Sequence, residues 1–230
     1  MNPSYTIEYN LEKDIWNWFY GANYTKNGEH HLKTPEEKEI LAKLQKLKTE
    51  KDAKPILESF LQEKIANKNS NLNYFLKATE NQFSEYFQKA CEAIIKITKQ
   101  PLAINKFTFY VTTFPRMVVF YDKGIIFLYA KIDNKLWGMP LDGFMHELLH
   151  FQTDKYWRKN PNSPVSKLSE DDYFKLKESL TVILDEELKP IITLPDCSYP
   201  EFKELREKLH SFWKQTHDFD ALIEYGTKIL

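Results

Sequence analysis

Two histidines and a glutamate form the segment of this sequence that is best suited to chemistry. His146 and His150 are four positions apart, and Glu147 directly follows the first of them. On an α-helix, residues four apart lie one above the other, so both imidazoles project from the same face and can share one metal ion. Glu147 is then not needed as a ligand and can take a proton from a metal-activated water. The spacing therefore predicts a hydrolytic zinc site with Glu147 as its general base.

Apolar residues surround this motif and favour a position in the interior of the fold. Met145, Leu148, Leu149 and Phe151 flank the polar residues on the expected helix. Two imidazoles and a carboxylate buried together without a metal would be costly to desolvate. We therefore prefer a metal site over the alternative, in which the histidines are ordinary polar groups of a helix.

A catalytic zinc site of this kind needs a third protein ligand and leaves the fourth position to water. We expect Glu178 to be this ligand, because it lies on the next predicted helix, residues 169–188, beside an apolar stripe. The adjacent His30 and His31 have no partner at ligand spacing and are expected to be exposed. Alternative third ligands are carboxylates near the end of the same helix and histidines on a later one: Asp185, Glu186, Glu187, His210 and His217.

The first hundred residues are predicted to be mostly helical. Apolar residues cluster in a short helix over residues 11–20, and Thr34, followed by Pro35 and then Glu37, is a strong helix start. Pro55 is expected to open another helix, which the polar residues 67–73 end. A further helix follows over residues 80–99.

An extended pattern begins at Lys106 and leads up to the motif. Residues 107–113, 118–121 and 125–130 are rich in β-formers, and residues 122–124 are a turn signal. We expect a small antiparallel sheet of about three strands. An exposed edge of such a sheet could hold a peptide in extended form, although a sheet that only covers the helix fits the sequence equally well.

The last part of the sequence, residues 201–230, is an amphipathic and helical region whose apolar side is expected to be core. Polar residues in or near this region could stabilise an oxyanion. The sequence does not choose among the candidates, which are Tyr199, Arg206, His210, His217 and Tyr225.

Composition and charge exclude several classes of protein. The 230 residues are 42% hydrophobic and 28% charged, as is typical of a soluble globular protein. A formal net charge of −1 gives no reason to expect nucleic acid or an anionic membrane as a partner. Two cysteines, Cys91 and Cys197, do not make a disulfide framework and are expected to be reduced thiols. With no signal-peptide pattern and no apolar run of membrane-spanning length, we expect a cytoplasmic protein.

The predicted order of elements is a sheet, then a helix with the His146–His150 motif, then a helix with a glutamate. This order resembles that of the gluzincin branch of the zincin metallopeptidases. The resemblance covers residues 107–188. It implies a Zn²⁺ ion held by His146, His150 and Glu178, with Glu147 as general base and proton shuttle in peptide-bond hydrolysis. Residues 151–157 lack the glycine and third histidine of the metzincin branch, which makes that branch a poor fit.

The sequence departs from the gluzincin pattern at one position. Four residues after the ligand glutamate, gluzincins have an aspartate that orients a zinc-bound histidine, and this sequence has Val182. The orienting group must then come from elsewhere, and Asp185 and Asp154 are the candidates. Residues 1–100 match no family that we can name.

We therefore predict an α+β protein. Residues 1–100 form a mostly helical N-terminal portion, and residues 101–230 form a zincin-like catalytic portion with a small antiparallel sheet, the active-site helix and C-terminal helices. The boundary falls at Gln100–Pro101, unless both portions form one continuous domain. The predicted function is zinc-dependent hydrolysis of a peptide or protein substrate. The alternatives are a non-hydrolytic metal-binding regulatory or interaction module, and a helical interaction domain in which the motif arose by chance.

Overall fold

The computed structural model describes residues 2–24, 34–130, 140–189, 191 and 199–230. His30, His31 and Cys197 lie outside these residues. The chain divides into two compact units, and each unit is built from segments that are distant in sequence. Unit 1 consists of Met1–Pro3, Gln82–Asn105 and Gly138–Leu230, and unit 2 of Ser4–Asn81 and Lys106–Trp137. The boundary expected at residues 100–101 falls inside unit 1.

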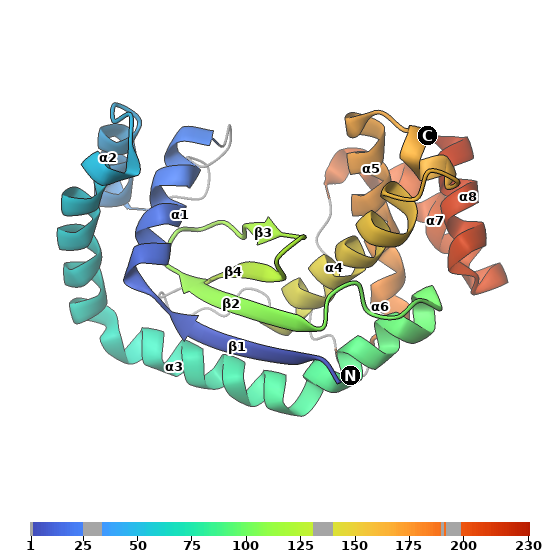
Figure 1. The fold of residues 1–230 in the computed structure, drawn as a ribbon, viewed down its shortest axis with the longest axis horizontal. Coiled ribbons are helices and arrows are strands. Elements are labelled where there is room, and N and C mark those ends of the chain that lie inside the picture. Colours follow the sequence, from blue (N-terminus) through green and yellow to red (C-terminus); the bar gives the residue numbers. More distant parts are fainter. Residues whose placement is uncertain (1, 25–33, 131–139, 190, 192–198) are drawn as a thin grey trace. The chain divides into compact units, whose positions relative to one another are not determined.

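Unit 2 contains a four-stranded mixed sheet, which confirms the α+β class (Figure 1). Its strands are β1 (Ser4–Tyr9), β2 (Lys106–Thr112), β3 (Val119–Phe120) and β4 (Ile125–Tyr129), in the order β1-β2-β4-β3. β1 and β4 run parallel to β2, and only β3 is antiparallel to its neighbour, β4.

The prediction of an antiparallel sheet is therefore wrong, for two reasons. The turn at residues 122–124 does make a β3–β4 hairpin, and Gly124 takes the positive φ of 64° that a turn of this kind requires. However, β4 inserts between β3 and β2, so that β2 pairs with a strand running in its own direction. β1 was not predicted from the sequence, although its alternation of exposed and half-buried residues is the pattern of a strand.

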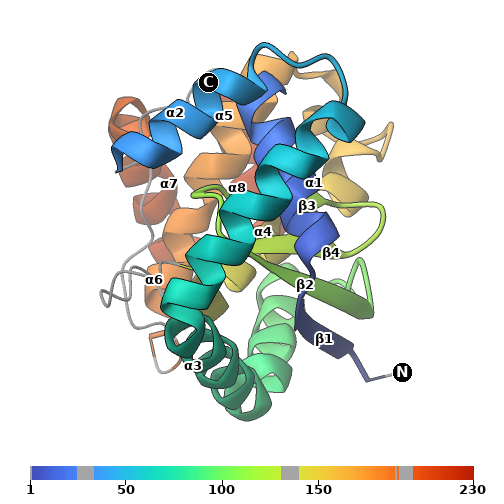
Figure 2. The same cartoon turned by 90° about the vertical axis from the view of Figure 1, so that its left-hand side faces the viewer.

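Three helices of unit 2 pack around one hydrophobic core. They are α1 (Leu11–Tyr24), α2 (Pro35–Leu44) and the first part of α3 (Glu50–Thr98), and Figure 2 shows them side by side. The predicted start of α2 is confirmed, because the Thr34 hydroxyl accepts a hydrogen bond from the Glu37 amide and the Glu37 side chain accepts one from the Thr34 amide. Trp18 lies at the centre of this core, edge-on to Phe60 and Phe114.

α3 is one helix of 49 residues, where two shorter helices were predicted. It begins before Pro55, because the Thr49 hydroxyl accepts a hydrogen bond from the Asp52 amide and caps the first turn. Residues 67–73 do not end the helix. They contain weak helix formers but no glycine or proline. Leu72, within this stretch, is buried in a second apolar cluster with Phe75, Val111 and Ala130.

Unit 1 contains the end of α3 and a group of shorter helices. They include α4 (Pro140–Thr153), a π-helical turn (Asp154–Arg158), a 3₁₀ turn (Pro164–Lys167), α5 (Glu170–Leu180) and a second 3₁₀ turn (Thr181–Ile183). α6 (Leu184–Glu187), a third 3₁₀ turn (Pro200–Phe202), α7 (Lys203–Thr216) and α8 (Phe219–Ile229) follow. The predicted helix over residues 169–188 is thus interrupted by a 3₁₀ turn. No helix among the described residues is both long and apolar enough to cross a membrane.

A close approach of three helices fixes the C-terminal part of unit 1. A Cβ atom at Gly226 on α8 would lie 2.6 Å from Leu176 Cδ1 on α5 and 3.2 Å from Leu209 Cδ2 on α7. The first distance is shorter than a carbon–carbon contact, so a larger residue at this position would require the buried Leu176 side chain to shift. α5 is the helix that bears the predicted third ligand, and its position is therefore set by its neighbours.

Candidate metal centre

Both ends of α4, the helix that bears the motif, form hydrogen bonds with other parts of unit 1. At its start, the amide of Leu141 donates a hydrogen bond to Gln82 Oε1 on α3. At its end, the buried Gln152 side chain donates to Thr98 Oγ1 at 3.2 Å and accepts from the Ala103 amide at 2.6 Å. Between these points, Phe144 stacks on Phe87 of α3, with ring centres 5.2 Å apart. α4 is thus a fixed platform for the motif.

α5 presents Glu178 toward this platform. The backbone carbonyl of Glu178 accepts hydrogen bonds from Arg206 Nη1 at 3.0 Å and from the Thr181 hydroxyl at 2.7 Å. Arg206 comes from α7 and also donates to Thr181 Oγ1, at 2.8 Å. A buried guanidinium thus holds the turn at which α5 passes into the 3₁₀ segment, directly after the expected ligand.

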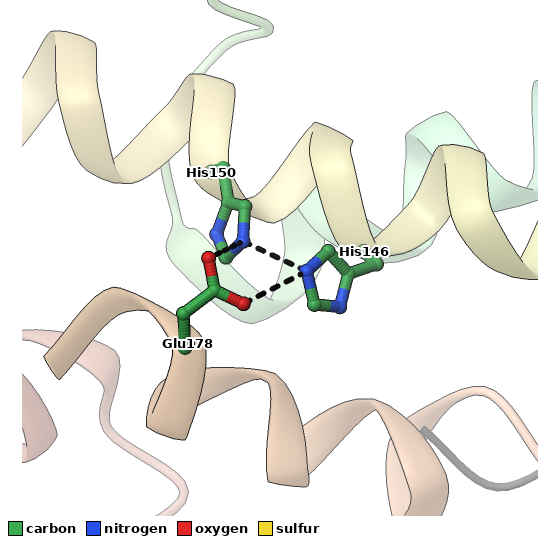
Figure 3. A group of neighbouring side chains, drawn as sticks. All are labelled: His146, His150 and Glu178. Atoms are coloured by element: carbon green, nitrogen blue, oxygen red, sulfur yellow. Dashed lines mark hydrogen bonds and ion pairs between the residues drawn. The ribbon is translucent and has the colours of Figure 1, made fainter. Parts of the chain in front are cut away.

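The side chains of His146, His150 and Glu178 converge, as Figure 3 shows. Glu178 Oε2 lies 3.3 Å from His146 Nε2, and Glu178 Oε1 lies 3.3 Å from His150 Nε2. The two Nε2 atoms are 2.9 Å apart. Three predicted ligands from two helices therefore point their donor atoms at one place.

These distances fit a shared zinc ion. A tetrahedral site with bonds of about 2.1 Å places neighbouring ligand atoms about 3.4 Å apart. Each imidazole Nε2 lies 3.3 Å from one of the two Glu178 carboxylate oxygens, close to this value, and the two Nε2 atoms are somewhat nearer to each other, at 2.9 Å. Two imidazoles and one carboxylate are also the donor set of a known type of catalytic zinc site. Calcium and magnesium prefer sites made of oxygen atoms alone, which makes them a poorer match.

Burial and neighbouring charges keep two of the three groups, His150 and Glu178, in the forms that bind metal. His150 is only 1% exposed, and its desolvation, together with the nearby His146, lowers its pKa and favours the neutral ring. Burial alone would raise the pKa of Glu178. Its contacts with His146 and His150, together with the charge of Lys177, outweigh this effect and hold that pKa well below the usual range. Glu178 is therefore ionised at neutral pH.

Glu147, the expected general base, is half-buried on the same turn of α4 as His146. Its carboxylate is close enough to favour the protonated form of His150, although burial has the larger effect on that ring. The position next to a ligand, on the helix that bears both imidazoles, is compatible with the role that the sequence predicts for it.

The alternative third ligands are occupied elsewhere or lie apart from the site. Glu186 is paired with His210 at 3.0 Å, and Glu187 accepts a hydrogen bond from Trp213 Nε1 at 3.0 Å and lies 3.2 Å from His217 Nδ1. Among the described residues, the one cluster able to hold a metal is that of His146, His150 and Glu178, and it does not include Asp185.

The expected orienting carboxylate is not found at His150. Its Nδ1 atom is buried and makes no hydrogen bond to any residue that the structure describes. Asp154 instead pairs with Lys159 at 2.6 Å. Three of the candidates for oxyanion stabilisation have other polar partners. Arg206 donates to the carbonyl of Glu178, His210 lies 3.0 Å from Glu186, and His217 lies 3.2 Å from Glu187.

One charged residue beside the site was missed in the sequence. Lys177 Nζ lies 3.3 Å from Glu178 Oε1, and only 16% of the Lys177 side chain is exposed. Lys177 directly precedes the expected ligand in the sequence, and this position could have indicated a role at the site. Lysines on the surface of a helix are common, however, so its type alone did not distinguish it.

No protein-family model matches this chain, and neither the curated proteins nor the solved structures include a match.

Proposed function

We propose that this protein is a zinc-dependent metallopeptidase. His146, His150 and Glu178 would hold the zinc, and Glu147 would be the general base. The observation that supports this most directly is the place of Glu178, whose carboxylate lies 3.3 Å from both Nε2 atoms although it comes from a different helix. A structural role for the histidines alone would not require an ionised carboxylate at this point.

Each residue has a distinct part in the reaction. Zinc held by the three ligands would polarise the carbonyl of the substrate and make a water molecule more acidic. Glu147 accepts a proton from the water that attacks the peptide carbon, and it returns this proton to the amine as the carbon–nitrogen bond breaks. The products are a carboxylic acid and an amine, and Glu147 ends as the carboxylate with which it began.

Metal content tests the site, and a single substitution tests the chemistry. We expect the protein purified without a histidine tag to contain about one zinc per chain, as measured by mass spectrometry of the metal. Glu147→Gln keeps the size of the side chain but cannot accept the proton. It should retain zinc and lose roughly 100- to 10,000-fold in the rate of peptide hydrolysis.

Glu224→Gln is the matched control, because Glu224 is exposed on α8. This variant should retain both zinc and full activity. If Glu147→Gln kept zinc and full activity, Glu147 would not be the base. Zinc binding without hydrolysis of any peptide would favour the alternative, a non-hydrolytic metal-binding module. An absence of bound zinc would exclude both.

A further inference from the structure

α5 bears a cation and an aromatic ring on the same side as Glu178. Phe174, Lys177 and Glu178 follow one another at the spacing of residues that share one face of a helix. Lys177 Nζ lies 3.3 Å from Glu178 Oε1 and 5.7 Å from the centre of the Phe174 ring. The ammonium group is thus held between the metal centre and the aromatic ring, and its side chain is mostly shielded from solvent.

Phe174 is part of a cluster of three aromatic rings, here called the aromatic shelf. Its ring centre lies 5.5 Å from that of Tyr199 and 6.0 Å from that of Phe202, and the last two are 5.3 Å apart. Phe202 is buried, whereas Phe174 is 38% and Tyr199 45% exposed. A single exposed apolar residue would be ordinary, but two exposed rings on a buried third one form a continuous apolar surface.

The shelf lies within reach of a peptide bound at the metal centre. Phe174 precedes Glu178 by four residues, which corresponds to about 6 Å along the helix axis. An extended peptide advances by about 3.4 Å per residue. A side chain one or two residues from a peptide bond at the metal centre can therefore contact the shelf.

The charges of the centre favour an anionic group on the substrate. When a dication is bound, the carboxylates of Glu147 and Glu178 balance its charge, and the ammonium of Lys177 leaves the site with a net positive charge. One carboxylate close to the scissile bond would neutralise it. If only one residue follows the scissile bond, that last residue has both the free α-carboxylate and the side chain nearest to the bond.

We propose that the preferred substrates are peptides whose last residue is bulky and apolar and has a free carboxylate. Lys177 binds that carboxylate, the aromatic shelf binds the side chain, and hydrolysis releases the last residue. This inference rests on the proposed function, because it places the scissile bond at the metal centre.

Binding of a product analogue tests the two contacts without relying on activity. N-acetylphenylalanine and its amide have the same side chain and differ in charge. We expect the acid to bind the zinc-loaded protein about 10-fold more tightly than the amide in calorimetric titrations, as a charge-assisted contact would produce. Lys177→Met should remove this difference while zinc is retained. Phe174→Ala should weaken the binding of both ligands by a similar factor, and the variant should keep its fold because Phe174 is exposed.

The control is Lys175→Met, since Lys175 is exposed on the same helix and lies 3.6 Å from Asp172. This variant should bind both ligands as the unchanged protein does. Equal binding of acid and amide to the unchanged protein would overturn the inference, and so would a preference for the acid that persists in Lys177→Met.

Cleavage of short peptides separates this inference from the proposed function. Peptides ending in phenylalanine, in phenylalanine amide or in aspartate are compared by mass spectrometry of the products. Release of terminal phenylalanine at least 10-fold faster than the other two reactions is expected. Cleavage of all three peptides at equal rates, or cleavage only at internal bonds, would overturn this inference but would still support the proposed peptidase function. Failure to bind zinc would overturn both.

Discussion

At the scale of single residues, Glu178 is the group that turns a pair of histidines into a candidate metal centre. Two imidazoles with their Nε2 atoms 2.9 Å apart are costly unless a proton or a metal lies between them. An ionised carboxylate 3.3 Å from each ring makes a metal the better explanation, because it completes a donor set of two nitrogen atoms and one oxygen atom.

Glu178→Gln should therefore reduce zinc affinity strongly. The amide retains the size of the side chain but supplies a neutral and weaker ligand. Since loss of an outer hydrogen-bonding partner already costs roughly 10- to 100-fold in affinity, loss of a ligand charge should cost more. Competition with a chelator measures the effect. Glu186→Gln is the control, because Glu186 pairs with His210 away from the centre, and a similar loss of zinc in this variant would contradict our assignment.

A second buried carboxylate, Asp14 of unit 2, predicts a pH dependence of stability. It accepts hydrogen bonds from the hydroxyls of Thr112 and Thr113 and from the Thr113 amide, at 2.7 to 2.9 Å. Burial raises its pKa above the usual value, although these hydrogen bonds oppose the effect. A raised pKa means that the folded state binds the proton more tightly. The contribution of Asp14 to stability is then fully present at a pH below the unfolded pKa and is lost as the pH rises through the folded pKa.

Asp14→Asn provides the comparison that isolates this contribution. Relative to the variant, the unchanged protein should gain stability as the pH is lowered from 7 toward about 4 and then level off below the pKa of an unfolded aspartate. Urea unfolding of both proteins at several pH values measures the difference. A difference that is constant over this range, or that grows with rising pH, would show that the pKa of Asp14 is not raised.

At the scale of elements, α7 fixes the direction of the third ligand without touching the metal centre. Arg206 donates hydrogen bonds to the carbonyl of Glu178 and to the hydroxyl of Thr181, and these contacts define where α5 ends. A catalytic zinc site tolerates little displacement of its ligands. Arg206 is therefore expected to act as a positioning residue for Glu178.

Arg206→Met should lower zinc affinity by about 10- to 100-fold, as loss of other outer partners of metal ligands does. Arg206→Lys retains a donor and should recover part of this loss. Zinc affinity and thermal unfolding of the metal-free proteins are measured together, because a role in stability alone would change the second and leave the first unaltered. Lys203→Met, on an exposed part of α7, is expected to change neither.

At the scale of the whole molecule, local patterns were predictable and long-range pairing was not. The motif helix and Glu178 were found because spacing along a helix depends on residues only a few positions apart. The capping box of Thr34 was found for the same reason. β4 runs parallel to β2 because it lies between β2 and β3 in the sheet. No residue of either strand specifies this strand order. β1 pairs with β2, which lies about a hundred residues further along the sequence, so a local sequence pattern cannot identify its partner.

The division into two units predicts that zinc stabilises only one of them. All three expected ligands belong to unit 1, and they join α4 to α5. A ligand that binds only the folded state contributes about 2.7 kcal/mol at 100 times its dissociation constant, which corresponds to a shift in unfolding temperature on the order of 10 °C for a unit of this size. Chelation should therefore speed amide hydrogen exchange in α5 and leave β2, in unit 2, unchanged. Equal acceleration in both elements would show that the metal supports the entire chain, and no change in either would mean that α4 and α5 are held together by packing alone.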